Sequence, residues 1–202
     1  MSKDRPHEVL TPNQTRAFEA EVLRLGFDLP TVQTTTIDTG ASQDGVVVGG
    51  ASSAVETKTL IVETLAQLRA EVGSDGTRQV SYPPAFPESR TRVLGGAGSA
   101  DEIWRMLTSA EREHLPAART AHLHGDPDRV AGYRELIERT QFPQTLEVHA
   151  AADVVVHPGK PLVFRGPNPI SVVYGSVTVL PGGQILCETE VRITTQVFKA
   201  AA

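Results

Sequence analysis

The chain has 202 residues, of which 40% are hydrophobic and 21% are charged, and its formal net charge is −5 at pH 7. This composition is typical of a globular protein with an ordinary core, and the acidic balance argues against nucleic-acid binding through a basic surface. Cys187 is the only cysteine, which excludes an intrachain disulfide and an all-cysteine metal site. No apolar run is long enough to predict a transmembrane segment, and the polar start at residues 1–8 does not resemble a secretory signal, so we expect a cytoplasmic protein.

Helix signals dominate the chain up to Phe142. Thr11 can cap a helix, Pro12 suits its first position, and Gln14 completes a capping box. Similar start signals and apolar stripes predict further helices over residues 55–72, from Ser99 onward, over 108–123 with an interruption at Pro116, and over 126–140.

Two stretches rich in glycine, serine or proline, residues 34–53 and 76–98, interrupt this helical region. We expect both to be surface loops, and the first contains a strand candidate at residues 46–48.

The character of the chain changes near Pro143, after which Val, Ile and Thr become frequent and favour strands. We therefore predict an α+β fold, with a mainly helical region at 1–142 followed by a β-rich region at 143–202. The two regions are expected to form one integrated domain.

An internal repeat is the most informative feature of the β-rich region. Residues 153–165 match residues 176–188, so that Val154 corresponds to Val177 and Pro158 to Pro181, at an offset of 23 residues. The apolar positions alternate, as one buried strand face requires.

Two architectures fit the repeat. One is a short β-solenoid of two to three coils in which matching residues stack, and the other is an antiparallel sandwich or cupin-like barrel. Both copies turn at Pro-Gly, which favours a type II turn, whereas tight hairpins prefer types I′ and II′. We therefore favour the solenoid.

A short solenoid exposes unpaired backbone and apolar side chains at its ends. The helical region can cover one end, and residues 191–198 can close the other or pair with a second copy. We therefore expect a non-catalytic structural or interaction protein that forms homo-oligomers through its β-rich region and uses no cofactor. A barrel that binds carbohydrate or another small ligand, whose identity the residues do not indicate, is an alternative.

Asp38 is the candidate catalytic residue of a second alternative, a hydrolase. The sequence Asp38-Thr39-Gly40-Ala41 resembles the catalytic loop of retroviral-type aspartic proteases. That resemblance implies two such loops meeting across a dimer, with paired carboxylates that share a proton and activate water. The chain departs from the family at Gly96, where the family has Arg or Asn after its second hydrophobic-hydrophobic-Gly element. A simple Asx turn at Asp38 is the structural alternative.

His122 and His124 have the spacing of a metal site and suggest a metal-dependent hydrolase. On a strand the two side chains would share a face and could bind Zn²⁺ with a third ligand such as His149 or His157. On a helix they would diverge, and the following Gly125 and Asp126 favour a helix-to-helix corner.

Cys187 alternates with Ile185 in the second repeat copy, which predicts a buried, unreactive thiol. Tyr82 and Tyr174 are the candidates for exposed aromatic platforms that could stack on a sugar or a base.

Overall fold

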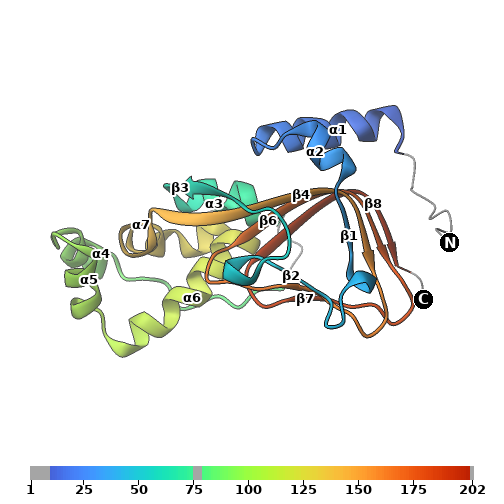
Figure 1. Cartoon of the computed structure of the whole chain (residues 1–202). Coiled ribbons are helices and arrows are strands. Elements are labelled where there is room, and N and C mark those ends of the chain that lie inside the picture. The colour runs from blue at the N-terminus through green and yellow to red at the C-terminus, as the bar shows by residue number, and fades with distance from the viewer. Residues whose placement is uncertain (1–9, 75–78, 201–202) are drawn as a thin grey trace, which may run out of the picture. The chain divides into compact units, whose positions relative to one another are not determined.

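A computed structural model describes residues 10–74 and 79–200 (Figure 1). The chain groups into two compact units. The first, called the sheet unit, comprises Met1–Leu60 and Leu146–Ala202, and the second, called the helical unit, comprises Ile61–Thr145.

The helical unit is built from short helices that bury one face each. These are α3 (Leu65–Val72), α4 (Glu88–Gly95), α5 (Ala100–Met106), α6 (Ser109–His124), the 3₁₀ segment η3 (Pro127–Tyr133) and α7 (Arg134–Gln141). Helix α6 begins with a capping box, because the Glu111 backbone N–H donates to Thr108 Oγ1 and the Thr108 N–H donates to Glu111 Oε2.

Three predicted helical segments differ from the helices of the structure. The segment predicted as one helix over 55–72 contains strand β3 (Lys58–Val62), whose β-branched residues favour extended backbone, and its helix starts only after the Thr64 cap. Helix α6 continues through Pro116, since the buried Leu115 and Ala118 anchor the turns around it. The segment 126–140 begins as 3₁₀ helix and becomes α-helical only at Arg134.

The sheet unit contains two parallel sheets, in which β4, β6 and β8 run side by side (Figure 1). The first sheet has the order β1-β4-β6-β8, with β3 also paired to β4, and the second has the order β2-β5-β7. The strands besides β3 are β1 (Thr36–Asp38), β2 (Val46–Val48), β4 (Gln144–Val156), β5 (Leu162–Phe164), β6 (Ile170–Val179), β7 (Ile185–Cys187) and β8 (Val191–Ala200). The helical segments of this unit are α1 (Pro12–Arg24), α2 (Leu29–Thr34), η1 (Thr39–Ala41) and η2 (Gly50–Ser52).

The predicted division into a helical region followed by a β-rich region is wrong. Strand β2 confirms the strand predicted at residues 46–48, but β1 and β2 pair in parallel with β4 and β5, so the first predicted loop contributes to both sheets. The fold is therefore a mixed α/β fold in which helices and strands interleave. The parallel pairing also differs from that of the antiparallel sandwich or barrel that was considered. The second predicted loop is partly wrong, because α4 occupies Glu88–Gly95 within it, and its residues 76–78 lie outside the described part of the chain.

The repeat seen in the sequence is the register of the parallel sheets. Val154 of β4 pairs with Val177 of β6, and Leu162 of β5 pairs with Ile185 of β7, both at an offset of 23 residues. Both Pro-Gly pairs occupy type II-like turns, with φ of +69° at Gly159 and +78° at Gly182.

The core of the sheet unit lies between the two sheets. It is formed by buried apolar side chains from both: Ile37, Val48, Ala151, Val154, Val156, Leu162, Phe164, Ile170, Val172, Tyr174 and Val177. Helix α1 contacts β6 and β8, where Gln14 Nε2 donates to the carbonyl of Gln196 at 3.2 Å. Within residues 10–74 and 79–200, no helix is both long and apolar enough to cross a membrane, and the cytoplasmic location stays a prediction.

Candidate functional site

The C-terminal edge, defined as strands β7 and β8, is where both sheets end. The Ile170 N–H of β6 donates to the Glu190 carbonyl at 2.9 Å. Because backbone groups of successive strand residues point to opposite sides, those of Val191 and Ile193 point away from β6. Strand β8 is ten residues long, and a long edge strand is a template for pairing with another chain.

Apolar side chains at this edge are more exposed than their counterparts one strand earlier. Leu162, Ile170 and Val172 are all 0% exposed, whereas their register partners Ile185, Val191 and Ile193 are half-buried. Two larger apolar side chains at the edge, Leu186 and Phe198, are 41% and 56% exposed. Among residues 10–74 and 79–200 no further strand pairs with β7 or β8, so the edge presents apolar surface and a strand side that no other strand meets.

The prediction of a buried thiol at Cys187 is wrong. Cys187 pairs in register with the fully buried Phe164, but its own side chain is exposed. Alternation places a side chain on a face, and burial also needs a further strand, which the described residues do not supply beyond β7.

The two tyrosines considered as stacking platforms differ from expectation. Tyr174 is fully buried in the core, and its burial raises the pKa of the phenol well above the ordinary value. Tyr82 is half-buried, and the Arg129 guanidinium lies 3.8 Å from its ring centroid.

Asp38 ends strand β1 and caps the 3₁₀ turn η1. Its Oδ1 accepts the Gly40 N–H at 2.8 Å, which is the Asx turn considered as the structural alternative. The same oxygen lies 2.9 Å from His157 Nε2. The sequence suggested His157 only as a metal ligand, and its pairing with Asp38 depends on the register of β1 on β4.

Asp38 and His157 belong to an open cleft, called here the Asp38 cleft. It is lined by Asp38, Gly40, Ala41, His157, Pro158 and Lys160, and its volume is about 300 Å³. Two further bonds join its walls: Lys160 Nζ donates to the Gly40 carbonyl at 2.8 Å, and the His157 N–H donates to Thr39 Oγ1 at 2.8 Å. The side chain of His157 is 33% exposed and that of Asp38 is 11% exposed.

His122 and His124 lie on helix α6 and are buried. His124 Nδ1 is hydrogen-bonded to Ser74 Oγ at 3.2 Å, and Arg69 donates to the His122 carbonyl. Burial, with a smaller effect of the nearby Arg69 charge, lowers the pKa of His122. The helix-to-helix corner is confirmed, since α6 ends at His124 and Asp126 caps η3.

The described residues contain no group of three or more His, Cys, Asp or Glu side chains arranged to hold a metal ion. Of the expected third ligands, His157 contacts Asp38, and His149 is buried with Nδ1 at 2.9 Å from the Glu56 carbonyl oxygen.

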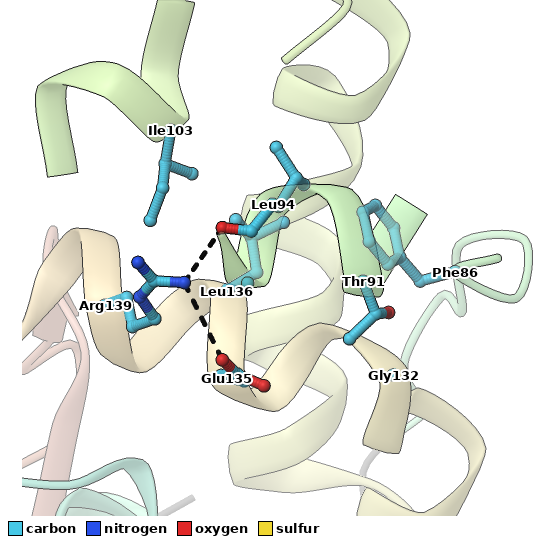
Figure 2. Close-up of a pocket in the computed structure, with 9 residues that line it drawn as sticks. Phe86, Thr91, Leu94, Ile103, Gly132, Glu135, Leu136 and Arg139 are labelled. Carbon is cyan, nitrogen blue, oxygen red and sulfur yellow. Dashed lines mark hydrogen bonds and ion pairs between the residues drawn. The ribbon is translucent and has the colours of Figure 1, made fainter. Parts of the chain in front are cut away.

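The helical unit has a small cavity between α4, α5 and α7 (Figure 2). Arg139 Nη1 donates to the Leu94 carbonyl at 2.9 Å and lies 3.7 Å from Glu135 Oε1, so all three residues are on one side of the cavity. The cavity volume is about 10 Å³. Such a space holds about one water molecule and is too small for an organic ligand.

Comparisons of the chain with models of known protein families, with curated proteins and with solved structures find no match. The geometry of the C-terminal edge and of the Asp38 cleft is therefore the basis for assigning a function.

Proposed function

We propose that this protein is a non-catalytic structural or interaction protein that assembles into homo-oligomers through its C-terminal edge. One observation carries the proposal: positions that are fully buried in β5 and β6 are only partly buried in β7 and β8. A second copy seated on the edge would bury these side chains and supply partners for the outward backbone groups of β8.

A short β-solenoid is the architecture we propose for the sheet unit. Its support is the like-to-like parallel pairing, with offsets of 23 residues between β4 and β6 and 21 residues between β6 and β8. Each turn of chain would then contribute one strand to each sheet. A solenoid needs a cap or a partner at its last coil, which is the reason to expect assembly there.

The charges near the C-terminal edge are compatible with a partner of the same sequence. Arg192 and Lys199 are on β8, while Glu188 and Glu190 immediately precede it. Glu188 is bound to Arg165, and the two signs are present in equal number among these four side chains, so the edge has no single-sign field that would repel a second copy.

A hydrolase that uses Asp38 is the second candidate, and the 2.9 Å contact with His157 favours it, because a histidine held by a carboxylate is a common general base. Replacing Asp38 with Asn would abolish hydrolysis of peptides if this candidate held, and the assay is run at acidic pH, for a carboxylate mechanism, and near neutral pH, where a histidine can act as a base. Absence of such hydrolysis in the wild type would leave the assembly proposal alone.

Light scattering over a range of concentrations tests the assembly proposal. The wild type is expected to exceed the single-chain mass of 21.7 kDa. The variant Phe198→Lys at the edge should reduce the mass, because it places a charge where apolar contact is proposed.

The matched control is Val93→Lys on α4, since Val93 is 50% exposed and Phe198 is 56% exposed. The control should assemble like the wild type. A wild type that stays at 21.7 kDa at every concentration would overturn the proposal.

A further inference from the structure

We propose that the Asp38 cleft is a binding site for a small oxyanion of the phosphate class. The cleft lies between residues 38–41 and residues 157–160, two segments far apart in the sequence, and its histidine and lysine, His157 and Lys160, are both on the second segment. This proposal is independent of the assembly proposed above.

Lys160 provides the positive charge. Its Nζ donates to the neutral Gly40 carbonyl, and within the described residues it forms no ion pair with a carboxylate. An ammonium group has three donors, so two remain for a ligand. The carboxylate of Asp38 is engaged by other groups of the cleft, since its Oδ1 accepts from the Gly40 N–H and lies 2.9 Å from His157 Nε2.

His157 provides a second donor. Its Nε2 faces Asp38, and its Nδ1 has no hydrogen-bond partner among the residues that the structure describes. When the ring is protonated, both nitrogens donate, so Nδ1 can serve a ligand while Nε2 serves Asp38. An oxyanion can accept from the lysine and the histidine together.

The loops hold these donors in place before any ligand arrives. Thr39 is fully buried, and its Oγ1 accepts the His157 backbone N–H. Gly40 leaves room for the ring, because a Cβ there would lie 2.8 Å from His157 Nε2 and 2.9 Å from Asp38 Oδ1. The volume of about 300 Å³ suits a small ligand.

Calorimetric titration of the full chain with inorganic phosphate tests the proposal, together with NMR of the histidine rings. We expect saturable binding and a shift of the His157 signals. Lys160→Gln and His157→Gln should each weaken binding about tenfold or more, since each removes a hydrogen-bond donor to the anion. Gly40→Ala should also weaken phosphate binding, because a Cβ at residue 40 would displace the His157 ring. This variant keeps both Lys160 and His157.

Lys58→Gln and His114→Gln are the matched controls, since neither residue lines the cleft, and both should bind phosphate like the wild type. Melting curves of all variants separate loss of the site from loss of the fold. The absence of saturable binding to the folded wild type at millimolar phosphate would overturn the proposal, and so would an equal loss in the control variants. The Phe198→Lys variant, which is expected not to assemble, should bind phosphate like the wild type. This result would keep the test of phosphate binding separate from the test of assembly.

Discussion

Leu162 of β5 and Ile185 of β7 are register partners in adjacent parallel strands, yet Leu162 is fully buried and Ile185 is only partly buried. The two side chains occupy equivalent positions on the same face of the sheet. Their difference arises because β7 is the last strand of its sheet. The energetic cost of removing each side chain should therefore differ, and the difference should depend on whether a second copy covers β7.

Leu162→Ala should lower the free energy of unfolding by about 2–5 kcal/mol, the usual cost of emptying a fully buried leucine site. Ile185→Ala should cost less in dilute solution, because part of its side chain already contacts water. At concentrations where the protein assembles, the cost of Ile185→Ala should rise. Urea unfolding of both variants at two protein concentrations measures this. Equal costs for the two variants in dilute solution would contradict the exposure of β7.

The thiol of Cys187 should react quickly with a thiol reagent in dilute native protein, because its side chain is exposed. The rate should fall as the protein concentration rises and assembly covers β7. In the Phe198→Lys variant the labelling should stay fast at every concentration. Slow labelling of the dilute wild type would show that β7 is already covered within one chain.

The Arg90–Glu111 ion pair should make the helical unit sensitive to acid. Arg90 Nε and Nη2 donate to the two carboxylate oxygens at 2.7 and 2.8 Å, and these bonds, with the Thr108 N–H, hold the pKa of Glu111 at about 2 against the ordinary 4.5. The folded-state pKa lies below the unfolded value, so the stabilisation is complete above about pH 4.5 and is lost as pH falls toward 2.

Glu111→Gln should therefore destabilise the protein by about 1–3 kcal/mol at pH 7, the worth of charge-assisted bonds, and by progressively less toward pH 2. Glu113→Gln, at an exposed position of the same helix, is the control and should have little effect. Thermal melts between pH 2 and pH 7 measure both. A destabilisation by Glu111→Gln that does not change with pH would contradict the assigned role of the ion pair.

Local signals predicted the helix starts because the groups that form a cap are neighbours in sequence. The box at Thr11 and Gln14 is present, with the Thr11 N–H donating to Gln14 Oε1 at 2.9 Å. Strands β1 and β2 have only three residues each, so their pattern is too short to predict their place. Their partners, β4 and β5, lie more than a hundred residues further along the chain.

The repeat predicted the register of the parallel sheets, because matched apolar positions pair directly: Val154 with Val177, for example. It did not predict that Cys187 is exposed, since alternation is the same in an inner strand and in an edge strand. The contact between Asp38 and His157 could not be predicted from the sequence either, because it depends on how β1 aligns with β4.

Amide hydrogen exchange at Ile193 tests the central claim most directly. Its N–H points away from β6, whereas the parallel pattern directs the Thr194 N–H toward the Val172 carbonyl of β6. Assembly through β8 should slow exchange at Ile193 as the protein concentration rises, while Thr194 stays protected at every concentration. Exchange at Ile193 that remains fast in concentrated protein would contradict assembly through the C-terminal edge.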